Sequence, residues 1–112
     1  MIDYKFNEDV LLDEIEQYIA STYAQHYSQN NFQSTEVIMA RGHGEGFCLG
    51  NIDKYVNRYG NKGSSPEDFR KDLIKIIHYG ILALYNHDKT YEEFDYENQW
   101  TNTISFAKFC KH

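Results

Sequence analysis

The chain has 112 residues, of which 41% are hydrophobic and 25% charged, and it contains a single proline. This length leaves room for one domain, and this composition excludes a wholly disordered chain and a collagen-like repeat. The net charge of −6 disfavours a surface for extended nucleic acid, because affinity for a polyanion comes chiefly from neutralising its phosphates.

The N-terminal part of the chain predicts one long helix, a loop and one short helix. Apolar residues recur at the spacing of an amphipathic helix over residues 8–23. Residues 26–34 are rich in Asn, Gln and Ser and predict a loop. A short helix is expected over residues 35–41, and glycines at 42, 44 and 46 interrupt the chain after it.

A third helix is predicted over residues 45–59, and Gly60 is expected to end it in the left-handed conformation. Turning each residue by about 100° gives this helix two faces. The face expected to point to the core holds Cys48, Ile52, Tyr55, Val56 and Tyr59. A separate polar stripe holds Asn51, Lys54 and Arg58, at spacings that let all three polar ends converge on one ligand.

The fourth helix has the clearest start signal in the chain. Ser65 can cap it, Pro66 suits the first helical position, and acidic residues fall in the first turn. We expect this helix to run over residues 66–86. Its apolar stripe, expected to face the core, is formed by Phe69, Leu73, Ile76, Ile77, Gly80, Ile81 and Leu84.

Residues 87–112 form a C-terminal extension rich in aromatic side chains, which we expect to add one more short helix packed on the bundle. No alternation of apolar and polar residues persists long enough to predict a strand. The expected fold is therefore all-α, a compact helical bundle of about four to five helices in a single domain over residues 1–112.

Neither a membrane span nor a zinc site is expected. No apolar run approaches the roughly 20 residues that a membrane helix needs, and no charged-then-apolar leader opens the chain, so we expect a cytoplasmic location. The two cysteines, Cys48 and Cys110, and the five histidines show no zinc-ligand spacing. Cys48 is most simply a small buried residue.

Basic residues gather in the middle of the chain. Residues 41–80 contain seven bases and five acids, whereas residues 1–40 contain one base and seven acids. A local basic pocket in an acidic protein suits a small phosphorylated ligand. The chain lacks the glycine-rich loops that usually cradle phosphate, so side chains must hold it, and Lys54, Arg58 and Lys62 are the candidates. The alternative is a solvated helix face.

Residues 26–85 resemble the SaV-like family of small bacteriophage proteins. The resemblance rests on His26-Tyr27, on Glu36-Val37-Ile38, on the block from Gly46 to Lys62, and on Asp72, Leu73, Lys75 and Tyr79. The same pattern occurs in the C-terminal part of a nucleotide kinase of T-odd coliphages that lacks a P-loop. Asn61 departs from it, because the family commonly has a lysine there.

The resemblance implies a bacteriophage protein with a nucleotide-sized ligand, acting in the cytoplasm of the infected host. Asn51 can read a base or ribose, or it bonds to a neighbouring loop. His26 and Tyr27 either contact the nucleotide or serve the fold. For a kinase, Asp72 or Glu36 would bind Mg²⁺ and Lys75 would contact the transferred phosphate. Otherwise Asp72 forms a structural ion pair with Lys75 or Arg58.

Two functions from different classes follow. The first is a deoxynucleoside-monophosphate kinase that needs Mg²⁺. The second is a non-catalytic sponge that sequesters a nucleotide signal of host antiviral defence. Several tyrosines fall on the apolar stripes, and in so short a helical chain part of this surface is expected to be buried between subunits, so we expect a homo-oligomer. We expect its pocket at a subunit interface, because one thin bundle can hardly enclose a nucleotide.

Overall fold

The computed structural model describes residues 1–29 and 31–92, and the side chains of residues 26–33 lie outside that description. Four helices follow one another in this part of the chain: α1 (Glu8–Gln29), α2 (Asn31–Ala40), α3 (Gly44–Arg58) and α4 (Pro66–Thr90). Over these residues the structure contains no strand, so the all-α prediction is confirmed. Residues 93–112, on which most of the predicted fifth helix falls, lie outside the described residues.

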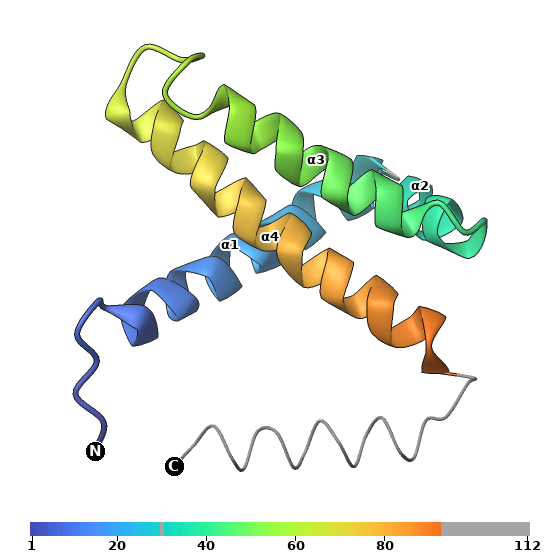
Figure 1. Cartoon of the computed structure of the whole chain (residues 1–112), viewed down its shortest axis with the longest axis horizontal. Helices are drawn as coiled ribbons and strands as arrows, with labels where there is room; N and C mark the ends of the chain where they lie inside the picture. The colour runs from blue at the N-terminus through green and yellow to red at the C-terminus, as the bar shows by residue number, and fades with distance from the viewer. Residues whose placement is uncertain (30, 93–112) are drawn as a thin grey trace.

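The pair formed by α3 and α4 is the centre of the fold. Figure 1 shows these two helices side by side and antiparallel, with α1 crossing α4 and α2 lying at the start of α3. At the α2–α3 end of the pair, α3 approaches α4 closely. A Cβ atom added to Gly44 would stand 2.1 Å from the side-chain oxygen of Asn86 on α4. The sequence indicates only a chain break at this glycine, whereas the structure uses it for helix contact.

The ends of α3 and α4 follow the sequence signals closely. Gly60 has φ of 76°, the left-handed conformation predicted for the end of α3. Ser65 caps α4, because its hydroxyl accepts a hydrogen bond from the Asp68 backbone N–H at 3.3 Å. The Asp68 carboxylate in turn accepts a bond from the Ser64 N–H, which lowers the pKa of Asp68. These reciprocal bonds fix where α4 begins.

The loop predicted over residues 26–34 is wrong. Residues 26–29 continue α1, and α2 begins at Asn31. Asn, Gln and Ser favour turns only weakly, and the segment contains neither Gly nor Pro to end a helix. His26 and Tyr27 are therefore in the last turns of α1 rather than in a loop, and their side chains lie outside the described residues.

Burial confirms only part of the predicted core. Cys48 is fully buried and Tyr55 is 8% exposed, as predicted for α3, and burial raises the pKa of the Cys48 thiol. Other residues predicted to face the core are exposed: Val56 on α3, Tyr59 directly after it, and Leu73, Ile77, Ile81 and Leu84 on α4. The physical reason is that α4 has two apolar faces. The face that covers α3 is the one through Asp72 and Tyr79, about 100° or more around the helix from the exposed residues.

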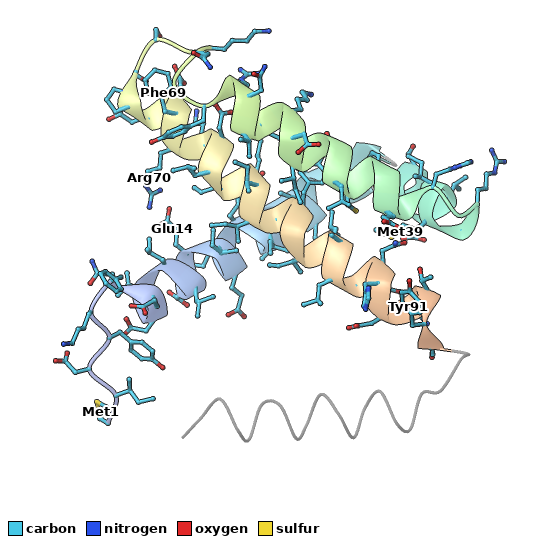
Figure 2. All side chains as sticks on the ribbon, viewed as in Figure 1. Met1, Glu14, Met39, Phe69, Arg70 and Tyr91 are labelled. Atoms are coloured by element: carbon cyan, nitrogen blue, oxygen red, sulfur yellow. The ribbon has the colours of Figure 1, made fainter. Side chains whose placement is uncertain are left out.

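The contacts that hold α1 against α4 are partly polar. Arg70 on α4 donates two hydrogen bonds to the two carboxylate oxygens of Glu14 on α1. Figure 2 shows these two side chains facing each other. This pairing lowers the pKa of Glu14. Farther along, the rings of Tyr18 and His78 meet edge to face with centroids 5.7 Å apart. Among the helices of the described chain, none has both the length and the apolar character needed to span a membrane.

Candidate functional site

Tyr55 lies between α3 and α4 beside charged side chains from both helices. Its ring stacks on Tyr79 of α4, with centroids 6.0 Å apart and planes 18° from parallel. The Lys54 ammonium lies 5.0 Å from the Tyr55 centroid, and the Lys75 ammonium lies 5.1 Å from it. Both distances are in the range of cation–π attraction. One ring therefore positions two cations that come from different helices.

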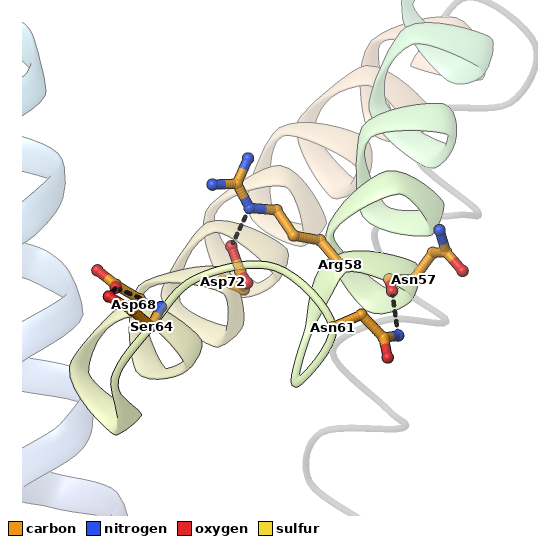
Figure 3. Close-up of polar contacts among 6 residues, drawn as sticks. All are labelled: Asn57, Arg58, Asn61, Ser64, Asp68 and Asp72. Carbon is orange, nitrogen blue, oxygen red and sulfur yellow. Dashed lines mark hydrogen bonds and ion pairs between the residues drawn. The ribbon is translucent and has the colours of Figure 1, made fainter.

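Arg58 extends the positive charge one turn farther along α3. Its Nε lies 3.4 Å from Oδ1 of Asp72 on α4, and the Asp72 side chain is only 5% exposed. Figure 3 shows that the two terminal nitrogens of the guanidinium point away from this carboxylate. Because the Arg58 side chain is 45% exposed, these nitrogens can still meet an anion from solvent. We call Lys54, Arg58 and Lys75 the cationic cluster.

The contact with Arg58 satisfies only half of the Asp72 carboxylate. The Oδ2 atom is buried and has no hydrogen-bond partner among residues 1–29 and 31–92. Of the interpretations left open by the sequence, the structure places Asp72 in an ion pair with Arg58 rather than with Lys75. A buried carboxylate in this position holds Arg58 in place, and it offers no exposed oxygen to a magnesium ion. Asp72 as placed therefore does not fit the role of a metal ligand.

Asn51 is the predicted site residue whose surroundings differ most from expectation. Its side-chain N–H donates to the Phe47 carbonyl of the preceding turn at 2.8 Å, so the amide bonds to its own helix and not to a neighbouring loop. This bond is the usual local use of a polar side chain within a helix. The described residues leave the other amide N–H and the amide oxygen available for a ligand.

The remaining predicted residues are less closely associated with the cluster. Lys62 follows α3 in a turn, with its backbone N–H bonded to the Arg58 carbonyl and its side chain exposed. Glu36 is exposed on α2. Over the described residues, the structure contains no group of three or more His, Cys, Asp or Glu side chains that could hold a metal ion. The part of the predicted site that the structure brings together is thus Lys54, Arg58, Asp72 and Lys75.

The spacing of residues in the sequence does not predict two further features of this region, Tyr79 and a depression beside Phe47. Burial and the neighbouring Tyr55 raise the pKa of Tyr79, which keeps its hydroxyl protonated. Phe47 meets the Tyr79 ring edge on, with centroids 5.9 Å apart. Phe47 also borders an open depression of about 630 Å³ between α2 and α3, which is lined by Ile38, Gly42, His43, Glu45, Gly46, Phe47 and Leu49. A short aromatic row therefore connects the cationic cluster to this depression.

Comparison with known proteins gives a family but no activity. Residues 21–80 match DUF3310, a family described as a protein of unknown function. No curated protein and no solved structure matches the chain significantly. The matched region includes α3, the first part of α4 and every residue of the cationic cluster. Because this match spans more than half of the chain, the protein belongs to the DUF3310 family.

Proposed function

We propose that the protein binds the phosphate groups of a small nucleotide through the cationic cluster. The observation that supports this most directly is the convergence of Lys54 and Lys75 on the Tyr55 ring, with the free end of Arg58 one turn away. Three cations accompany a single buried carboxylate there, so the cluster has an excess of positive charge. The buried Tyr55 ring beneath the cluster excludes water, and the attraction between these cations and an anion is stronger where water is excluded.

We propose a small ligand because the positive charge is confined to the cationic cluster while the chain as a whole is acidic. The chain as a whole carries a net charge of −6, and residues 1–40 hold seven of its acids. An extended nucleic acid crossing this surface would meet repulsion beyond the cluster, whereas a mononucleotide or dinucleotide would not. The edge of the aromatic row at Tyr79 and Phe47 offers a surface on which a base can stack.

Two activities can be built on such binding, and both are proposals that rest on the resemblance to bacteriophage proteins. In the first, the protein is a deoxynucleoside-monophosphate kinase in the cytoplasm of an infected bacterium, with Lys75 on the transferred phosphate and Mg²⁺ as cofactor. In the second, it is a nucleotide sponge that sequesters a defence signal without turnover. The ion pair of Asp72 with Arg58 favours the second, since one of the two carboxylates proposed for the metal is already occupied.

Calorimetric titration of the four deoxynucleoside monophosphates, their triphosphates and a cyclic dinucleotide tests the binding proposal. We expect Lys54→Ala and Lys75→Ala each to weaken binding of at least one of these nucleotides by about tenfold, because each removes one contacting charge. Lys71→Ala is the matched control, because Lys71 is an exposed lysine of α4 outside the cluster. Binding by none of the probes, or equal weakening by all three variants, would contradict the proposal.

The same mixtures distinguish the two activities when a nucleoside triphosphate and Mg²⁺ are added. Formation of a diphosphate from any monophosphate, analysed by chromatography, would establish the kinase. Recovery of every bound nucleotide unchanged after denaturation would establish the sponge.

A further inference from the structure

The side of α4 turned away from the cationic cluster carries a row of uncovered apolar side chains. Leu73, Ile77, Ile81 and Leu84 are 42%, 46%, 45% and 62% exposed. Their spacing of four, four and three residues places them along one face of the helix. We call these four residues the α4 stripe. A continuous apolar row of this kind on a helix marks an interaction surface.

The described chain buries few apolar residues, so the exposed α4 stripe is a large part of the apolar surface that it could still bury. Its buried apolar residues are Ile15, Cys48 and Tyr55. A small domain depends on burying a large share of its apolar surface, and it commonly gains the remainder by association. The α4 stripe adjoins the existing contact between α1 and α4, at Arg70, so a partner helix there would extend an interface that the chain already has.

Gly80 is a second and independent indication that something approaches this face. It lies in the middle of α4, where glycine is unfavourable by roughly 1 kcal/mol relative to alanine. Among the described residues, a Cβ atom added to Gly80 would meet nothing within 4 Å, so no contact in this part of the chain explains the glycine. A glycine beside an apolar row allows a second helix backbone to come close.

We propose that the α4 stripe packs antiparallel against the same stripe of a second copy of this chain. A two-fold axis near residue 79 places Ile77 opposite Ile81 of the other copy and Gly80 close to the crossing point. The same register places Arg70 opposite Asp88, an exposed acid near the end of α4, and symmetry makes this pair twice. Each Arg70 nitrogen that bonds to Glu14 carries a second hydrogen, so Arg70 can bond to Asp88 of the second copy while it stays paired with Glu14.

This dimer does not depend on the proposed nucleotide site. Lys75 is two residues from both Leu73 and Ile77, so it projects from the opposite side of α4. The cationic cluster of each copy therefore stays open to solvent in the dimer. Loss of the dimer should leave nucleotide binding in place, and loss of nucleotide binding should leave the dimer in place.

Sedimentation velocity of the full chain over a range of concentrations tests the proposal. We expect the wild type to have twice the 13.3 kDa mass of one chain, and Ile77→Asp to weaken self-association at least about tenfold. Val56→Asp is the matched control, since Val56 is an exposed apolar residue of α3 outside the stripe, and it should remain dimeric. Circular dichroism checks that each variant keeps its helices.

Gly80→Ala keeps the test decisive if Ile77→Asp fails to fold. The added methyl group meets none of the described residues of its own chain and favours the helix, so we expect a monomer at least as stable as the wild type but a dimer weakened several-fold. A wild type that is monomeric at all concentrations, or a dimer that neither variant weakens, would overturn the proposal. A monomer whose Trp100 emission responds to Ile77→Asp would also overturn it, and would place the chain's own residues 93–112 on the stripe.

Discussion

Replacing Tyr55 by alanine should lower the free energy of unfolding by about 3–5 kcal/mol, the largest loss expected from a single substitution in this chain. The Tyr55 side chain is almost wholly buried between α3 and α4 and stacks on Tyr79. Truncation would leave a cavity between the two helices that make up the centre of the fold. It would also remove the ring beside which Lys54 and Lys75 lie.

Urea denaturation followed by circular dichroism measures this loss. Tyr55→Phe is the matched control, because it keeps the ring and removes only the hydroxyl, so we expect a loss of about 1 kcal/mol or less. Val56→Ala, at the exposed neighbouring position, should likewise change stability little. A loss for Tyr55→Ala no larger than for these two variants would show that Tyr55 is not part of the core.

Replacing Arg58 by methionine should lower the free energy of unfolding by about 2–3 kcal/mol, although its side chain is partly exposed. Methionine keeps much of the aliphatic length of arginine but leaves the Asp72 carboxylate buried without its cation. The expected loss is therefore the penalty of an unpaired buried charge rather than of lost packing.

A double-mutant cycle with Asp72→Leu separates these contributions. The double variant should recover most of the stability lost in Arg58→Met, since replacing both members of a buried ion pair by apolar residues is often close to neutral. Additive losses from the two substitutions, measured by urea denaturation, would mean that Arg58 and Asp72 are not coupled.

Helix positions follow from the sequence where local chemistry decides them. The cap at Ser65, the proline at 66 and the glycine at 60 each act within one or two turns of chain, and the structure has α3 and α4 ending or beginning where these residues predict. The loop wrongly predicted over residues 26–34 also reflects local chemistry, because this segment has no strong local signal. Turn-favouring polar residues without Gly or Pro give no decisive local signal, so α1 continues to Gln29 and α2 already begins at Asn31.

Which face of a helix becomes buried is decided by its neighbours, and here sequence reasoning failed for α4. A helix with apolar residues on two faces gives no indication of which one a partner will cover. The α3 helix covers the face through Asp72 and Tyr79, and the α4 stripe is left exposed. Only the approach of two helices reveals that a charged residue, Asp72, lies in the interface.

The candidate site shows the same division between local and long-range information. The spacing of Lys54 and Arg58 on one helix predicts that they share a side, and the structure has both of them beside α4. The position of Lys75 next to Lys54, across Tyr55, depends on the register between two helices and could not be worked out from periodicity. Periodicity also does not predict the bond from the Asn51 side chain to the Phe47 carbonyl. This bond competes with any ligand for one hydrogen of the Asn51 amide.

The most direct measurement of nucleotide binding at the cationic cluster is lysine footprinting of the unmodified protein. The chain would be treated with an amine-reactive reagent in the presence and absence of each deoxynucleoside monophosphate and triphosphate, and modification of every lysine quantified by mass spectrometry. We expect at least one nucleotide to protect Lys54 and Lys75 together, while Lys71 and Lys89 react as before. Unchanged reactivity at Lys54 and Lys75 with every nucleotide, or protection spread evenly over all lysines, would contradict nucleotide binding at this cluster.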